Sequence, residues 1–383
     1  MNAIPPKKVA MVVANIPHIH TGKGGHYYST REIYLALKSR LDVNLIVVGH
    51  SIPDALQDID GIELVRVGRF LSPGGIIALL KIFRGRSVDV AHCMDSSALL
   101  YSRLAAHFLR LPIVWTKCGG RTLRRYTPRR APDTVFHKDD LDFYRSKGFA
   151  PRLIPNRISV QATVTANPRS IRTGATKLRF VRVSRICRKY EDGLLKSIAF
   201  VRALNEAGIP ADLDVIGYLE DSEVFGRLER AASAETRILT SAEWTTRASR
   251  RLGDYDAAIA TGRAAMEALA MGMPTFATPA RSPAPVFIGR ENFPTLLNAN
   301  ISERAPVAND MDVAVHAVRN LYASDEALSD YRSWCLGTAG SELDVQGAVG
   351  KYTSVYASAN YRFRVSNIWD LIKHVGSFHL AMI

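Results

Sequence analysis

Short apolar runs alternate with amphipathic segments along most of the 383 residues. In the first part of the chain, the runs expected to form strands are 8–15, 43–50, 62–68, 88–94, 112–118, 133–137 and 152–158. Helical periodicity marks 26–41, 74–83 and 96–110 between them. Continuous apolar strands separated by helices indicate a parallel sheet that is covered on both faces. We therefore expect a first α/β domain over residues 1–168.

The alternation is lost over residues 159–176, which are rich in Ser, Thr, Ala and Pro, as a linker would be. It then resumes, with strands expected at 177–185, 211–218, 236–241, 255–261 and 274–279. Helices are expected at 192–207, 221–233, 245–252 and 263–271. These elements predict a second α/β domain of similar construction over residues 169–355.

The last part of the chain is helical in pattern and ends in an amphipathic segment. Ile368, Leu371, Ile372 and Val375 follow the i, i+3, i+4, i+7 spacing of one helix face. Apolar helix faces are usually buried, so we expect residues 356–383 to pack back onto the first domain. Docking of this face on a membrane surface is the alternative.

Composition limits the kinds of binding partner and the cellular compartment that we expect for the protein. The formal net charge is +14, which favours anionic partners. Five arginines lie within residues 121–130 and favour an anionic lipid or polysaccharide, so contact with an anionic membrane stays open. No nucleic-acid recognition signature accompanies them. The four cysteines show no CxxC spacing, and no apolar stretch approaches the ~20 residues of a membrane span, which favours a cytoplasmic protein.

The stretch "TGRAAMEALAMGMPTFATP" (261–279) carries the clearest chemistry. A strand leads through Gly262 into a helix that starts at Arg263, and such helix N-termini bind anions. Glu267 lies one turn into that helix and could accept hydrogen bonds from a ribose diol. It could equally form an i, i+4 ion pair with Arg263 on a solvated face. The residues alone leave both readings open.

The same stretch resembles the donor-binding signature of retaining, nucleotide-sugar-dependent glycosyltransferases of the GT-B fold, particularly glycosyltransferase family 4. The resemblance implies that Glu267 holds the ribose and that Gly262, with its neighbour Arg263, faces the diphosphate. "HTGKGGHYY" resembles the first loop of that family, so Gly24 and Gly25 are expected near the donor phosphates or the acceptor. The likeness runs from residue 8 to about residue 290.

Further segments match the family in the same order. "RLIPNRIS" resembles the element that closes its first domain, and "FVRVSRICRKYEDG" resembles the opening of its second domain. The resemblance implies that Arg185 and Lys189 neutralise the donor diphosphate. It also implies that Gly217, in "LDVIGY", lines the nucleotide pocket.

Two positions depart from the family pattern. Ile259 stands where the family has a glutamate, eight residues before the ribose-binding one, and Lys117 stands where many members have a histidine. Lys117 and His92, the nearest histidine, are therefore the catalytic candidates, although His92 could also be a packing residue at a strand end. No DxD motif stands out, no metal is expected, and Asp212 and Asp214 are expected to be structural.

The resemblance thus implies two Rossmann-like domains that face each other across a cleft. It implies a metal-independent, retaining glycosyltransferase that uses a nucleotide-diphosphate sugar as co-substrate, needs no other cofactor, and acts on a glycan or lipid-linked acceptor of the cell envelope. The alternatives are a nucleotide-sugar 2-epimerase of the same fold or a catalytically impaired nucleotide-sugar or anionic-glycan binding protein. A dinucleotide oxidoreductase would need GxGxxG after the first strand, and "TGKGGHYY" does not follow that pattern.

Overall fold

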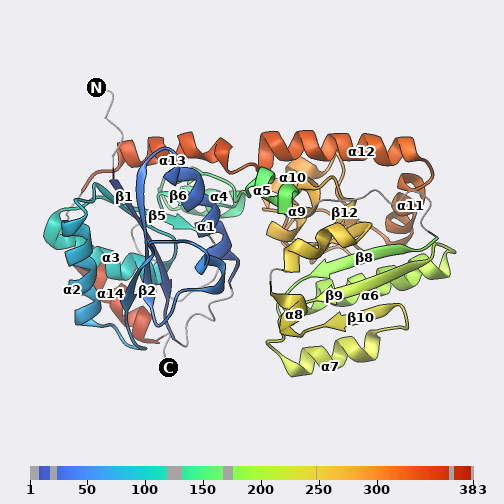
Figure 1. The fold of residues 1–383 in the computed structure, drawn as a ribbon, viewed down its shortest axis with the longest axis horizontal. Helices are drawn as coiled ribbons and strands as arrows, with labels where there is room; N and C mark the ends of the chain where they lie inside the picture. The colour runs from blue at the N-terminus through green and yellow to red at the C-terminus, as the bar shows by residue number, and fades with distance from the viewer. Residues whose placement is uncertain are drawn as a thin grey trace. The chain divides into compact units, whose positions relative to one another are not determined.

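The computed structural model describes residues 8–17, 24–118, 132–166, 176–246, 248–361 and 366–380. The chain forms two compact α/β units, labelled in Figure 1. The first unit comprises Met1–Asn156 and Val345–Ile383, and the second comprises Arg157–Asp344. The predicted architecture of two α/β domains is confirmed.

The division between the units differs from the boundaries expected at 168 and 355. Helix α5 (Val160–Ala166) lies in the expected linker and packs on α9 (Arg263–Ala270) of the second unit. Helix α13 (Gln346–Ser358), expected to end the second domain, packs on α1 (Gly25–Lys38) of the first. Both segments carry apolar residues that bury against these helices, so they join the unit whose core they complete.

The first unit is built on a sheet in which every paired neighbour is parallel. Its strand order in the described residues is β3-β2-β1-β4-β5-β6-β7. The strands are β1 (Lys8–Asn15), β2 (Asp42–Gly49), β3 (Glu63–Arg66), β4 (Val90–Cys93), β5 (Ile113–Lys117), β6 (Thr134–Val135) and β7 (Arg152–Leu153). The central strands are buried on both faces, as their continuous apolar runs predict.

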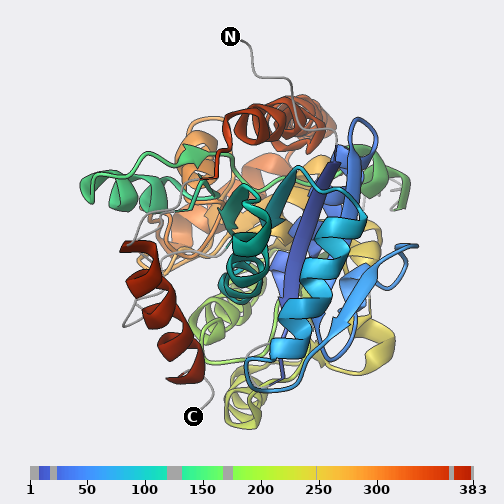
Figure 2. The same ribbon diagram turned by 90° about the vertical axis from the view of Figure 1, so that its left-hand side faces the viewer.

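Helices cover both faces of this sheet. Helices α1 and α13 pack on one face. The other face carries α2 (Pro73–Gly85), α3 (Ser96–Leu109) and α14 (Ser366–Leu380), which Figure 2 shows from the side. A short 3-10 turn, η1 (Asp54–Leu56), and α4 (Lys138–Ser146) complete the connections.

The expectation that the tail packs back onto the first unit is confirmed. Asp370 of α14 pairs with Arg103 of α3 at 2.8 Å, and the ring of Phe378 lies edge-on to that of Tyr101. The buried face is rotated from the predicted one, because Phe378 is buried while Ile372 is 54% exposed. The side chain of Ile368 lies outside the described residues.

The second unit has the strand order β10-β9-β8-β11-β12-β13 in its described residues. These strands are β8 (Leu178–Val183), β9 (Ala211–Ile216), β10 (Thr236–Leu239), β11 (Ala257–Ile259), β12 (Thr275–Ala277) and β13 (Val286–Phe287). All pair in parallel except β13, which is antiparallel to β12.

Helices also cover both faces of the second sheet. One face carries α6 (Glu191–Glu206), α7 (Ser222–Ala231) and α11 (Met311–Leu321). The other face carries α9, α10 (Phe293–Asn298), α12 (Asp325–Thr338) and the π-helical turn η3 (Ala339–Leu343). Residues 245–252, expected as one helix, do not form one: the short α8 (Ala242–Thr245) ends at Thr245, and η2 (Ala248–Asp254) begins at Ala248.

Each sheet has one point at which its strand order reverses. Strand β1 lies between β2 and β4, and β8 lies between β9 and β11. The chain therefore winds outward in both directions from β1 and from β8. In open parallel sheets, ligands bind at the carboxyl ends of the strands at this switch point. The topology thus marks one candidate position in each unit, at β1/β4 and at β8/β11.

Candidate functional site

Two helices begin at the switch point of the second unit. Helix α6 follows β8 and α9 follows β11, and these strands are neighbours. Their N-cap residues, Tyr190 and Gly262, make no side-chain capping hydrogen bond. The amides of a first helical turn have no partner within the helix, and the helix dipole adds partial positive charge there. The first turn of α9 carries no acidic residue and therefore suits an anion, whereas the first turn of α6 carries Glu191 and Asp192, which pair with Arg227 and Lys196.

Gly262 forms the tight turn between β11 and α9. Its backbone has φ 58° and ψ −128°, a conformation that only glycine adopts without strain. Its amide donates to the carbonyl of Ile301 at 2.7 Å, so a loop that follows α10 braces the turn. The glycine expected at the diphosphate is thus required by the backbone itself.

Arg263 and Glu267 form the i, i+4 ion pair that one reading of the sequence predicted. The Nε of Arg263 lies 2.7 Å from Oε1 of Glu267. The two side chains are only 18% and 9% exposed, so the pair does not lie on a solvated face. Because Arg263 fixes one carboxylate oxygen, Glu267 is held in a defined orientation near the start of α9. A role in holding a ribose stays a prediction.

The basic residues after β8 differ in how far their charge is compensated. Arg185 donates to both carboxylate oxygens of Glu220, at 3.0 and 3.3 Å. Arg188 pairs with Asp221 and Glu223 and is largely exposed. Lys189 lies 4.9 Å from the ring centre of Tyr190, is exposed, and makes no ion pair with the residues that the structure describes. Among these three, Lys189 alone makes no ion pair with a described residue, beside the start of α6.

Two positions at this end of the sheet have structural explanations. A Cβ at Gly217 would lie 1.8 Å from the carbonyl oxygen of Ser184, so the glycine lets the ends of β8 and β9 approach closely. The expected nucleotide contact is not needed to explain it. Ile259 is the last residue of β11 and is fully buried in the core that packs against α6. It therefore cannot reach a ligand at the strand ends.

The switch point of the first unit has a carboxylate of its own. Asp95 caps α3 by accepting from the amide of Ala98 at 2.8 Å, and it also accepts from the amide of Ala14 at 2.7 Å. Gly24 is the N-cap of α1 without a side-chain cap, and Gly25 is its first residue. The preceding part of the glycine loop, residues 18–23, lies outside the described residues. Asp95 thus occupies the position at α3 where an anion would bind.

The structure does not support a catalytic role for His92. The side chain is fully buried on β4, and its ring nitrogens lie 2.8 Å from the Tyr356 hydroxyl and 2.6 Å from the Thr116 hydroxyl. Burial lowers the pKa of His92 to about 3, which keeps the ring neutral. Both ring nitrogens are engaged inside the core, so this histidine is a packing residue at a strand end.

Lys117, the other catalytic candidate, ends β5 and forms an ion pair. Its Nζ lies 2.8 Å from Oδ1 of Asp140 on α4, and Asp140 is almost fully buried. The lysine thereby compensates a buried carboxylate, which would be costly to leave unpaired. Any role of Lys117 toward a substrate stays a prediction.

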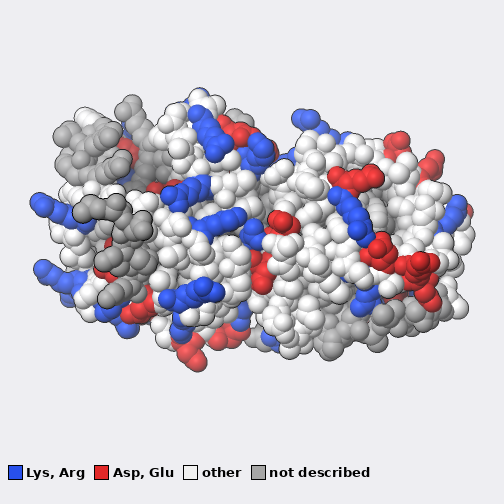
Figure 3. Space-filling model, turned by 90° about the horizontal axis from the view of Figure 1, so that it is seen from above, with Lys and Arg blue, Asp and Glu red and all other residues white. Residues whose placement is uncertain are grey.

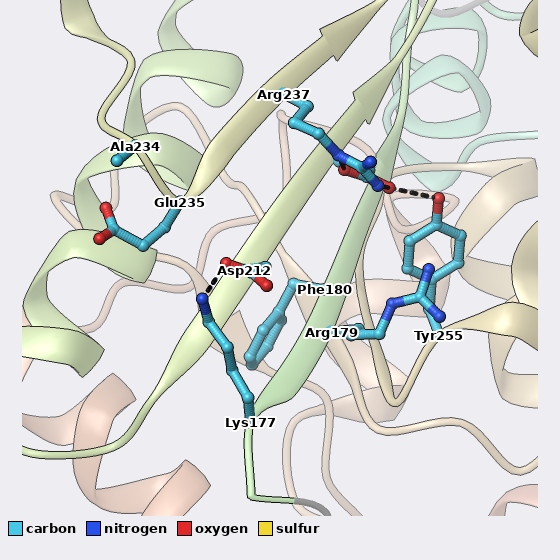
Figure 4. A pocket seen from close by; sticks show the side chains of 9 residues that line it. Lys177, Arg179, Phe180, Asp212, Ala234, Glu235, Arg237 and Tyr255 are labelled. Carbon is cyan, nitrogen blue, oxygen red and sulfur yellow. Dashed lines mark hydrogen bonds and ion pairs between the residues drawn. The ribbon is translucent and has the colours of Figure 1, made fainter.

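A cavity of about 360 Å³ lies at the opposite, amino end of the second sheet (Figure 4). Four of its charged residues form two ion pairs. Lys177 lies 2.6 Å from Asp212, while Asp214 accepts from Arg237 and from the Tyr255 hydroxyl. Such mutual pairing leaves few groups to recognise a ligand and supports the structural role expected for Asp212 and Asp214.

Several expectations concern charge and membrane contact. Acidic and basic side chains are interspersed on the described surface in the view from above (Figure 3), so this face has no single-sign patch. The arginine-rich residues 121–130 lie outside the described residues. No helix in the described ranges is long and apolar enough to span a membrane. The same ranges contain no cluster of three or more His, Cys, Asp or Glu residues suited to a metal ion.

Comparisons with known proteins agree on the fold. No family model matches the chain. No curated protein matches it in sequence. The solved structures similar to it include a glycosyltransferase from Rickettsia africae, with a TM-score of 0.62 at 13% identity over 91% of this chain and 98% of that one.

HepE of Anabaena, solved with UDP and glucose, has a TM-score of 0.63 at 12% identity over 91% and 99% of the two chains. A UDP-GlcNAc 2-epimerase from Neisseria meningitidis, bound to UDP-GlcNAc, has a TM-score of 0.52 at 12% identity over 91% and 100%. Two Rossmann-like units and this likeness over nearly the full length establish that the chain has the GT-B fold.

Proposed function

We propose that the protein is a glycosyltransferase that transfers a sugar from a nucleotide-diphosphate sugar to a glycan or lipid-linked acceptor. The observation that carries the proposal is the β8/β11 switch point. There, the uncapped starts of α6 and α9 lie with Lys189 and the Gly262 turn at the carboxyl end of one sheet. In this proposal the diphosphate binds at the helix starts, and Glu267 accepts the ribose hydroxyls.

The proposed mechanism is electrostatic. The bond between the anomeric carbon and the diphosphate oxygen breaks, and its electron pair stays on the diphosphate. Helix amides, Lys189 and Arg185 would stabilise the charge that develops there. The acceptor hydroxyl forms the new glycosidic bond on the same face of the sugar and releases its proton to the departing phosphate. These groups would supply the stabilisation from the chain itself, so the proposed reaction needs no metal; that it retains the configuration is part of the same proposal.

The structural neighbours support a nucleotide sugar as donor. HepE was solved with UDP and with UDP-glucose, and the Neisseria epimerase was solved with UDP-GlcNAc. These proteins share the fold at 12% identity or less, so their ligands enter only as the first compounds to test. The epimerase is the second candidate function, since its fold is the same.

An acceptor at a membrane surface is supported by the outer face of the first unit. Exposed apolar side chains occur on α2, α3 and α14 and just before α2, namely Ile77, Phe108, Trp369, Ile372 and Phe70. Helices α2 and α3 carry no acidic residue, and the single acid of α14, Asp370, is buried against Arg103. Exposed lysines and arginines on these helices, such as Lys81 and Lys373, would favour an anionic bilayer.

Binding and turnover test the proposal. We expect isothermal titration to show binding of UDP, UDP-glucose or UDP-GlcNAc by the wild-type protein and loss of that binding in Glu267→Ala. A glycosyltransferase then releases UDP only when an acceptor is present, whereas an epimerase converts UDP-GlcNAc to its 2-epimer without one. If no nucleotide or nucleotide sugar of a broad panel binds, the proposal is wrong.

Sedimentation with vesicles tests the membrane surface. We expect the protein to sediment with vesicles of phosphatidylglycerol and phosphatidylcholine but not with phosphatidylcholine alone. Phe108→Ala combined with Trp369→Ala should weaken sedimentation, while Leu35→Ala on α1, an exposed leucine on the other side of the sheet, should not. Equal sedimentation of all three proteins would contradict this surface.

A further inference from the structure

The loop that braces Gly262 also places a carboxylate at the β8/β11 switch point. This loop follows α10, and its Ile301 carbonyl accepts from the amide of Gly262 at 2.7 Å. Two residues later, the carbonyl of Glu303 accepts from the amide of Ala280, also at 2.7 Å, just beyond the end of β12. Glu303 is therefore fixed between the start of α9 and the end of β12, on the edge of the sheet where the donor is proposed to bind.

The Glu303 side chain is unusual in its hydrogen bonding. It is half-buried, and its Oε1 is inaccessible to solvent without a hydrogen-bond partner among the described residues. Burial raises the pKa of Glu303, and the positive charges of Arg182, Lys189 and Lys196 oppose that rise. Buried carboxylate oxygens normally accept hydrogen bonds, so a ligand with a hydroxyl or N–H group could supply the hydrogen bond that this oxygen lacks.

A buried cation lies behind this carboxylate. Arg182 on β8 is fully buried, and none of its three guanidinium nitrogens has a hydrogen-bond partner in the described part of the chain. Burial lowers the pKa of Arg182 to about 10, and Glu303 is the group that chiefly counters this effect. The two side chains are not in direct contact, because no ion pair within 4.0 Å joins them.

The surroundings of Arg182 are polar and closely packed beneath α6. A Cβ at Gly193 would lie 3.1 Å from Nη2 of Arg182 and 2.8 Å from Oγ1 of Thr278. That threonine oxygen is also buried without a partner. Gly193 therefore makes room for Arg182 and Thr278, and the carboxyl ends of β8 and β12 enclose polar groups that no described residue satisfies.

We propose that Glu303 accepts hydrogen bonds from the hydroxyl groups of the donor sugar, and that Arg182 is a positioning residue that acts on this carboxylate through its buried charge, without touching it. The inference rests on the proposed function, because it assigns the sugar part of the same donor. It also explains how the site works with Ile259 in the core: the loop at 300–303, and not the end of β11, supplies the acidic group. The positive charge of Lys189 also acts on the Glu303 carboxylate. Lys189 would therefore lie between the part of the site that binds the sugar and the part that binds the diphosphate.

Affinity ratios test this assignment without an acceptor. Isothermal titration would measure the dissociation constants of UDP, UDP-glucose and UDP-GlcNAc for the wild type, Glu303→Ala, Glu303→Gln and the control Glu291→Gln. Glu291 is an exposed carboxylate of the same unit. We expect Glu303→Ala to weaken the preferred nucleotide sugar at least ~10-fold while leaving UDP within about twofold, and Glu303→Gln to fall between it and the wild type. The control should match the wild type.

A second pair of variants tests Arg182. Arg182→Met should lower the ratio of nucleotide-sugar to UDP affinity in the same direction as Glu303→Ala, and Arg182→Lys should restore part of it. A merely structural role would lower both affinities together and the melting temperature with them. Unchanged ratios in the Glu303 variants, or equal losses for UDP and the nucleotide sugar, would overturn the inference. If the wild type binds neither these three compounds nor any other nucleotide or nucleotide sugar of a broad panel, the proposed function itself fails, which is a separate and recognisable result.

Discussion

The two switch points of this molecule share their strand topology but differ in the residues at the N-termini of their helices. In the first unit, Asp95 caps α3 and ties it to β1, so a carboxylate of the chain fills the anion position. In the second unit, neither α6 nor α9 has a side-chain cap, and Lys189 lies beside the start of α6. At the equivalent helices α3 and α9, the same βαβ topology therefore leaves the helix start open to an anion in the second unit and closes it with the chain's own carboxylate in the first.

The two units also differ in whether their buried polar side chains have hydrogen-bond or ion-pair partners. The ring of His92 is satisfied by Tyr356 and Thr116, and Lys117 is paired with Asp140. In the second unit, polar atoms of Arg182, Thr278 and Glu303 lack partners within the described residues. Unsatisfied buried groups are costly, and they are retained most readily where a ligand satisfies them. Under the proposed function, a bound donor would satisfy these groups of the second unit.

The largest effect is expected for Glu267→Ala, which tests whether the switch point of the second unit binds the nucleotide. A carboxylate that accepts two hydroxyl hydrogen bonds contributes several kcal/mol, so we expect UDP to bind about 100-fold more weakly. Isothermal titration measures the change. The matched control is Asp212→Asn in the cavity at the amino end of the same sheet, which should leave UDP affinity unaltered. Equal losses in both variants would mean that the second switch point is not the nucleotide site.

Removing the carboxylate that fills the first switch point should cost stability. Asp95→Ala loses a helix cap and leaves the amide of Ala14 without its partner, so we expect unfolding free energy to fall by about 2–3 kcal/mol. Asp221→Ala, which removes the cap of α7 without a bond to a distant strand, should cost only about 1 kcal/mol. Urea unfolding compares them. A smaller loss for Asp95→Ala than for Asp221→Ala would contradict the role assigned to Asp95.

The neutral, buried state of His92 predicts a pH dependence. The folded-state pKa of about 3 lies below the unfolded value of 6.5, so the unfolded chain binds more protons between these limits. Stability is then complete above pH 6.5 and falls as pH drops toward 3, by about 1.4 kcal/mol per unit from this group. His92→Gln should flatten the decline between pH 6.5 and 5, and His316→Gln, an exposed histidine, should not. An unaltered slope in His92→Gln would show that the histidine is not buried neutral.

The smallest expected effect sharpens the role of Lys189. Lys189→Ala should weaken UDP about 5- to 10-fold, since one partly solvated cation at a phosphate contributes about 1 kcal/mol, and the loss should shrink as salt is added. Uridine, which lacks phosphates, should bind both proteins alike. Arg188→Ala is the control, because Asp221 and Glu223 already compensate that arginine. If Arg188→Ala weakened UDP binding more than Lys189→Ala, the diphosphate would contact Arg188, and the role assigned to Lys189 would be wrong.

Much of the fold follows from the sequence because its strands are continuous apolar runs. The expected strand at 8–15 coincides with β1, and "TGRAAMEALA" forms the expected turn and helix. The unit boundaries do not follow from periodicity, because α5 and α13 join the unit in which their apolar faces find partners. Local patterns indicate that a face is apolar and leave open which neighbour covers it.

The site was predictable only in part for a similar reason. Some site residues can be identified from the sequence because they lie in continuous motifs, namely Gly262, Arg263, Glu267 and Lys189. Glu303 belongs to an irregular loop, and long-range contacts bring that loop to the strand ends: hydrogen bonds with Gly262 and Ala280, and the burial of Ile301 in the core. Its one local signal was a charged residue after an asparagine-rich turn. For His92 the sequence left both a catalytic and a packing role open, because a strand-end histidine looks the same in sequence whether it faces solvent or the core.

The location of bound UDP tests the central claim most directly. A crystal structure of the protein grown with UDP should show the diphosphate at the N-termini of α6 and α9, within hydrogen-bond distance of Lys189, with the ribose hydroxyls on Glu267. Diphosphate density at the β1/β4 switch point, or in the cavity lined by Asp212 and Arg237, would contradict the account.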